Sequence, residues 1–117
     1  MQAPTKVTKR EASAASGSSA AILAFAGDIS STSKEAILGA WHGLAGTSAN
    51  LLLDFTAVDY INSAGIAIII QMLLEAAGKQ TVAIFGLSPH FQKVFTMVGI
   101  NRYAALCKDE PSALAAL

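Results

Sequence analysis

A serine between an asparagine and a small apolar residue is the position in this chain best placed to do chemistry. Asn62, Ser63 and Gly65 open a strongly apolar segment that follows a short polar connection. Asn or Ser before an apolar run predicts a helix N-terminus, because its side-chain oxygen accepts hydrogen bonds from free backbone N–H groups. Such a terminus also carries a partial positive charge. The sequence therefore predicts that Ser63 lies where an anion can be accommodated.

The sequence gives little support for a catalytic site or a metal-binding site. A Ser-His-Asp hydrolase would combine Ser63, a histidine and Asp54, but the Gly-x-Ser-x-Gly turn of such nucleophiles is missing from the sequence. His42 and His90 lie far apart and lack further ligands at metal-site spacing, so both are interpreted as surface residues. We expect no enzyme: no catalytic residue, no cofactor and no metal.

The composition is that of one small folded domain. Hydrophobic residues make up 53% of the 117 residues and charged residues only 14%, so the chain can bury a core. Its formal net charge is zero, and basic residues do not interleave with aromatic ones. Nucleic-acid binding therefore has no electrostatic support.

Three features bear on where the protein is found. The single cysteine, Cys107, cannot form an internal disulfide, which favours a reducing compartment. The first nineteen residues are polar and small, so we expect no signal peptide. The longest uninterrupted apolar run near the Ser63 helix, residues 64–70, is far below the roughly 18 to 20 residues of a spanning helix. We expect a cytoplasmic protein without a membrane span.

Five segments are predicted to be strands. Residues 5–11 are compatible with a strand but polar, as in an edge strand guarded by lysines, and residues 14–19 form a turn after it. Residues 20–26 read as a more buried strand that ends at Gly27 and Asp28. Near-continuous apolar runs predict central strands, and a short last strand follows them: residues 51–55, 81–86 and 103–107.

Helices are predicted between these strands. Apolar spacing, N-cap residues and terminal glycines place them at residues 34–44, 62–77, 89–98 and 110–117, with a loop over residues 46–50. Strands that alternate with helices imply right-handed crossovers and parallel pairing. We therefore expect an α/β fold: a mixed, mostly parallel sheet of four to five strands with helices packed against it.

Four motifs in order then resemble one known family. They are residues 27–30 (Gly-Asp-Ile-Ser), the strand at 51–55 with Asn-Ser-Ala-Gly-Ile at 62–66, residues 85–89 (Phe-Gly-Leu-Ser-Pro) and residues 94–100 (Val-Phe-Thr-Met-Val-Gly-Ile). Together they resemble the STAS domain, the fold of bacterial anti-sigma-factor antagonists. The resemblance implies a single STAS domain over residues 6–117, preceded by a flexible tail at residues 1–5.

The resemblance also implies a mechanism. In the antagonist branch, an anti-sigma factor that is also a serine kinase phosphorylates the first serine of Asp-Ser-Ser/Thr-Gly, which Ser63 matches. The unphosphorylated form would bind the kinase and free the sigma factor, and the phosphorylated form would release it. The partner must hold the ATP, because the sequence has no Gly-x4-Gly-Lys-Ser/Thr loop. A phosphatase is a further candidate partner, and we expect a monomer or a weak dimer.

The same resemblance predicts the partner-binding residues, with departures from the family pattern. Asn62 replaces the usual Asp and Ala64 the second hydroxyl residue, so Ser63 is the sole acceptor of the motif. Asn caps a helix about as well as Asp, but a negative charge beside the acceptor is lost. Ser30 likewise replaces an acidic residue. The predicted binding face is Asp28, Ser30, Asn62, Ser63, Ala64 and Gly65.

Two other functions stay open at this point. One is a STAS interaction module whose binding does not depend on phosphate, such as a signalling scaffold or the soluble partner of a lipid-transport ATPase. The other is a small-ligand sensor with a saturable pocket near the Ser63 helix. Asn62 in place of Asp favours both of these alternatives.

Overall fold

The fold is a mixed sheet with helices on both faces. The protein was analysed as a computed structural model, which describes residues 4–14, 17, 19–43 and 49–117. The sheet order follows the chain order. Only the first pair of strands is antiparallel, and the other neighbours are parallel. The strands are β1 (Lys6–Ser13), β2 (Ser19–Ile29), β3 (Asn50–Ile61), β4 (Thr81–Phe85) and β5 (Ala105–Leu106). The predicted α/β fold with a mostly parallel sheet is confirmed.

The helices follow the predicted alternation. They are α1 (Lys34–His42), α2 (Ser63–Ala76), α3 (Pro89–Met97) and α4 (Glu110–Ala115), with short 3-10 helices η1 (Ser31–Ser33) and η2 (Ile100–Arg102). Gly78 and Gly99 follow α2 and α3 in the left-handed conformation expected of helix-ending glycines. The described residues leave out residue 44, half of the predicted turn at 14–19, most of the loop at 46–50 and residues 1–3 of the predicted tail.

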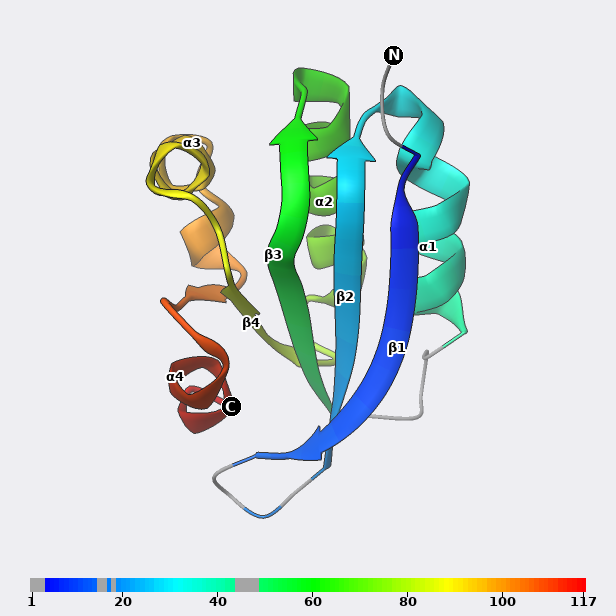
Figure 1. The fold of residues 1–117 in the computed structure, drawn as a ribbon. Coiled ribbons are helices and arrows are strands. Elements are labelled where there is room, and N and C mark those ends of the chain that lie inside the picture. Colours follow the sequence, from blue (N-terminus) through cyan, green and yellow to red (C-terminus); the bar gives the residue numbers. More distant parts are fainter. Residues whose placement is uncertain (1–3, 15–16, 18, 44–48) are drawn as a thin grey trace.

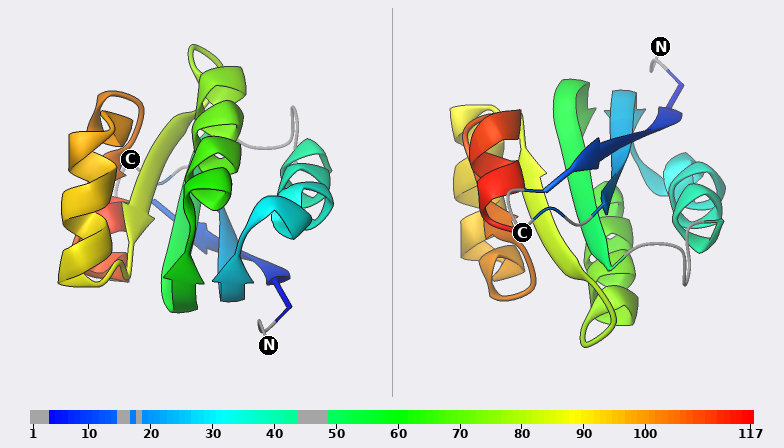
Figure 2. Two further views of the ribbon diagram at one scale, coloured as in Figure 1. Left: turned by 90° about the horizontal axis from the view of Figure 1, so that it is seen from above. Right: turned by 90° about the horizontal axis from the view of Figure 1, so that it is seen from below.

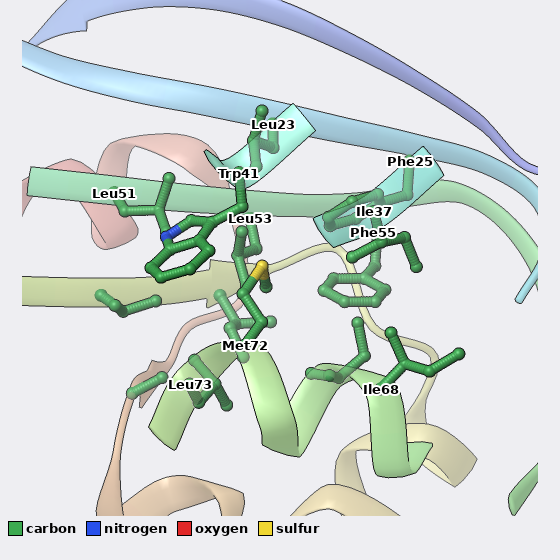
Figure 3. Packing of buried hydrophobic residues seen from close by; sticks show 14 of the residues in the cluster. Leu23, Phe25, Ile37, Trp41, Leu51, Leu53, Phe55, Ile68, Met72 and Leu73 are labelled. Carbon is green, nitrogen blue, oxygen red and sulfur yellow. The ribbon is translucent and has the colours of Figure 1, made fainter. Parts of the chain in front are cut away.

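The main core lies between the sheet and helices α1 and α2. Figure 1 looks onto the sheet with both helices behind it, and Figure 2 shows the same layers from its two ends. Leu23, Leu53 and Phe55 of the strands meet Ile37 of α1 and Met72 of α2 (Figure 3). All of these side chains are at most 2% exposed, so burial of one apolar face explains why both helices dock here.

A smaller apolar cluster lies on the opposite face of the sheet. Ile22, Leu52 and Phe85 of the strands pack there with Ala113 of α4. Figures 1 and 2 show α4 near β4, away from α1. Because both faces of the central strands are covered, β2 to β4 read as nearly continuous apolar runs in the sequence.

Strands β2 and β3 run further than predicted, and the two predicted ends were wrong. The strand predicted over residues 20–26 was expected to end at Gly27 and Asp28, but β2 continues to Ile29. Residues 56–61 were expected to form a connection, but β3 continues to Ile61. Two register shifts between the paired strands add extra residues to β3. As a result Phe55, Val58 and Ile61 contact the core at a spacing of three, which hides the strand period of two.

Arg10 of β1 ties the edge of the sheet to α4. Its guanidinium donates to Glu110 through Nη1 to Oε2 at 3.3 Å and through Nη2 to Oε1, and Nη2 lies 3.8 Å from Asp54 Oδ2. The hydrogen bond from Arg10 holds the pKa of the Glu110 carboxyl below its usual value. Both side chains are partly exposed, so the pair belongs to the weakly stabilising class of surface ion pairs.

Replacing Arg10 with methionine is expected to cost stability at neutral pH but less in acid. A carboxyl whose pKa is lowered by folding stabilises the protein above its unfolded pKa, and this contribution is lost as the pH falls through the folded value. The loss at pH 7 should be roughly 0.2–1 kcal/mol. Urea unfolding at pH 7 and pH 3 measures it, with Lys9→Met on the same strand as control. An equal loss at both pH values would contradict this role of the pair.

Candidate functional site

Ser63 lies at the edge of the sheet where β2 and β3 end. It is the first residue of α2 and is exposed. Asn62 is the N-cap: its Oδ1 accepts from the Gly65 N–H at 2.8 Å, while its own N–H donates to the Ile29 carbonyl at 3.1 Å. The predicted cap is therefore confirmed, and it attaches the start of α2 to the last residue of β2.

Gly65 allows a close approach of two backbone segments. A Cβ at this position would lie 2.4 Å from the carbonyl oxygen of Ile29 and 2.9 Å from its Cγ2. Carbon atoms do not approach a backbone oxygen this closely without displacement of the chain. The glycine thus lets the first turn of α2 rest directly on the end of β2, and this contact sets the position of Ser63.

Residues 27–30 lie next to this turn as the bulged end of a strand. Gly27 has a φ of 83°, and a register shift with β3 follows it. Asp28 is half-buried and is the partner of Tyr60 in the ladder. Ser30 caps η1, accepting from the Thr32 N–H at 3.4 Å, and is only 4% exposed.

The structure brings the six predicted binding residues to one edge but gives them different exposure. Ser63 is exposed, and Asp28, Asn62 and Ala64 are half-buried. Ser30 and Gly65 are buried. Ser30 and Gly65 therefore support the edge from inside. The other four residues are at least partly accessible to solvent: Asp28, Asn62, Ser63 and Ala64.

An aromatic pair between β3 and α3 is absent from the predicted set. Tyr60 of β3 is 52% exposed, and its ring meets that of Phe91 in α3 edge to face at 6.0 Å between centroids. Exposed tyrosines are enriched in protein interfaces. The signal available in the sequence was a lone aromatic within a polar stretch, three residues before Ser63.

The side chains of a hypothetical hydrolase have separate partners. His42 lies 3.7 Å from Glu75, and Asp54 lies near Arg10. Burial raises the pKa of the Cys107 thiol, which disfavours the nucleophilic thiolate. Within the described ranges, no three His, Cys, Asp or Glu residues are grouped to hold a metal ion. No helix in this part of the chain is long and apolar enough to cross a membrane.

Comparison with known proteins adds a family and a fold. A family model described as "Mlab, STAS domain" matches residues 12–108. No protein with a curated description matches the chain by sequence.

Among solved structures, the chain is similar to an anti-sigma factor antagonist from Mycobacterium paratuberculosis, with a TM-score of 0.79 and 16% identity over 97% of this chain and 96% of that one. It is also similar to the antagonist SpoIIAA in its unphosphorylated form, with a TM-score of 0.67 and 13% identity over 89% of each chain. The phosphorylated form of SpoIIAA from Bacillus gives a TM-score of 0.62 and 15% identity over 88% of this chain and 92% of that one. At these identities the likeness concerns the fold.

Proposed function

The chain belongs to the STAS domain family, and we propose that it is an anti-sigma-factor antagonist that works by partner switching. The unphosphorylated form binds an anti-sigma-factor serine kinase, and phosphate on Ser63 releases it. The chain itself is not an enzyme, since the kinase holds the ATP. The proposal includes a cytoplasmic location, a monomer or weak dimer, and a phosphatase that restores the unmodified form.

The observation that carries this proposal is the place of Ser63. Its side chain is exposed at the first position of a fourteen-residue helix, so a kinase can reach the hydroxyl without unfolding the domain. A phosphate adds about −1.5 to −2 charges at pH 7. At a helix N-terminus a negative charge is stabilised by roughly 0.3–1 kcal/mol. The free domain therefore tolerates the modification.

A phosphate on Ser63 weakens the binding of a partner at this edge. In a close interface the dianion must lose its water, and this costs free energy unless the partner offers matched donors. An acidic group on the partner would add repulsion. The switch thus needs a changed surface rather than a changed fold. SpoIIAA supports this view, because its unphosphorylated and phosphorylated forms both share this fold.

Phosphorylation of Ser63 is tested by intact mass. The purified chain and a Ser63→Ala variant are incubated with ATP and a lysate of the source organism. We expect one added phosphoryl group on the native chain and none on the variant, because Ser63 is the exposed hydroxyl of the motif. A Ser31→Ala variant controls for the nearby exposed hydroxyl of η1 and should still be modified. A partner retained by a chain that is never modified would contradict the phosphate switch.

A constitutive interaction module is the second candidate. Asn62 replaces the acidic residue of the antagonist motif, and the matching family model carries the description "Mlab, STAS domain". Such a module, as a scaffold or a lipid-transporter subunit, would bind its partner through the same edge whatever the state of Ser63. Retention of the partner by both phosphorylated and unphosphorylated protein would favour it.

A further inference from the structure

One peptide group joins the end of β2 to the Ser63 turn. The carbonyl oxygen of Ile29 accepts from the Asn62 N–H at 3.1 Å, and the first turn of α2 packs on the same carbonyl at Gly65. The N–H of this peptide group belongs to Ser30 and donates to Ser33 Oγ at 2.9 Å. The peptide is therefore held at both ends, and the N-cap of α2 depends on its orientation.

A chain of hydroxyl groups continues from this peptide to the residue before β1. Thr5 Oγ1 donates to the carbonyl oxygen of Asp28 at 2.6 Å and also contacts Ser33 Oγ. Both hydroxyl groups reach the Asp28 carbonyl, Thr5 at 2.6 Å and Ser33 at 3.5 Å. The much shorter distance assigns the single Thr5 proton to this carbonyl, so Ser33 donates in the contact between the two hydroxyl groups. The bonds then run in one direction, from the Ser30 N–H through Ser33 and Thr5 to Asp28. Bonds aligned in this way strengthen one another.

This arrangement holds the backbone on both sides of Ile29. Thr5 holds the carbonyl before Ile29, and Ser33 holds the N–H after it. Ser33 is 1% exposed, so solvent does not readily replace its bonds. Figure 1 shows that the beginning of β1 lies at the same edge of the sheet as the ends of β2 and β3 and the start of α2.

We propose that Thr5 and Ser33 are positioning residues for Ser63. They orient the Ile29–Ser30 peptide, this peptide holds Asn62, and Asn62 presents Ser63 at the start of α2. The role of Ser63 as acceptor rests on the proposed function, whereas the positioning concerns the geometry of the turn. Thr5 directly precedes β1, and its hydrogen bond to Asp28 connects it to the end of β2.

Amide hydrogen exchange measured by NMR tests the proposal without a kinase. In Thr5→Val, which keeps the side-chain shape but removes the hydroxyl, the Asn62 amide should exchange about two- to tenfold faster than in the native chain. Ser33→Ala should act in the same direction. Thr5→Ser, which keeps the hydroxyl, should restore native exchange. Thr8→Val, on the exposed part of β1, is the matched control and should leave Asn62 unchanged.

Two results would overturn the positioning role. One is native exchange at Asn62 in both Thr5→Val and Ser33→Ala. The other is an equal acceleration at the Leu52 amide in the buried part of β3, since that would show general destabilisation. A chain that is never phosphorylated at Ser63 would contradict the proposed function but leave the exchange result intact, so the two failures are distinguishable. If Ser63 is phosphorylated, the rate of phosphorylation should be lower in Thr5→Val than in the native chain. The rate in Thr8→Val should equal the native rate.

Discussion

Replacing Gly65 with alanine is expected to lower the free energy of unfolding by about 1–3 kcal/mol, the usual cost of overpacking a core. The added methyl group would meet the Ile29 carbonyl oxygen at 2.4 Å, so the first turn of α2 must move away from β2. This movement acts against the gain of roughly 0.5–1 kcal/mol that alanine normally brings to a helix. Urea unfolding of the variant measures the difference.

Gly39→Ala is the matched control for this prediction. Gly39 also lies inside a helix, but a Cβ there would have no heavy atom within 4 Å beyond its chain neighbours and the backbone of its own helix. The same substitution should therefore stabilise the protein by about 0.5–1 kcal/mol. Opposite signs at the two positions would identify the contact with Ile29 as the cause. Stabilisation by Gly65→Ala would show that α2 begins without this close approach.

Phosphate on Ser63 is expected to weaken partner binding by at least about 100-fold. Like charges or an unpaired dianion in an interface cost several kcal/mol, and each 1.4 kcal/mol is a factor of ten in affinity. The change should arise mainly from faster dissociation. Surface plasmon resonance with the captured partner, run on the phosphorylated and unphosphorylated chain, measures both rates.

The fold should persist through this change. The thermal unfolding midpoint of the phosphorylated chain should stay within a few degrees of the native value, because a helix N-terminus tolerates a negative charge. Ser63→Ala, treated in parallel with the kinase and ATP, should keep its partner. A loss of partner that accompanies unfolding would contradict a surface switch, and equal binding of both forms would identify a constitutive module.

Asn62 can replace the acidic residue of the antagonist motif without a change in the geometry of the turn. Asn62 Oδ1 accepts from Gly65, and its N–H donates to Ile29. The first bond can be accepted by an Asn or an Asp side chain, and the second comes from the backbone, so the geometry of the turn does not require a charge. What the acidic residue would add is a negative field beside Ser63, and its absence concerns the partner rather than the domain.

Much of this fold is encoded in local sequence signals. Asn62 and Ser88 mark helix starts through side-chain oxygens that accept from nearby N–H groups, and Gly78 and Gly99 mark helix ends through left-handed backbone. Apolar runs identify the central strands, because both faces of the sheet are covered. These signals depend on residues within one turn or one strand, so the order of elements and the place of Ser63 were predictable.

Other features depend on neighbours distant in the sequence. The β2–β3 bulges shift inward residues from a spacing of two to three, so residues 56–61 did not read as a strand. The bond from Thr5 to Asp28 forms because antiparallel pairing brings the start of β1 to the end of β2. The burial of Ser30 likewise appears only in the tertiary structure. In the sequence, Gly65 is only a weak sign of a close contact. The approach of the Ile29 carbonyl explains why this position has no side chain. Local patterns locate Ser63 at the start of a helix, whereas contacts between separate strands and helices position it.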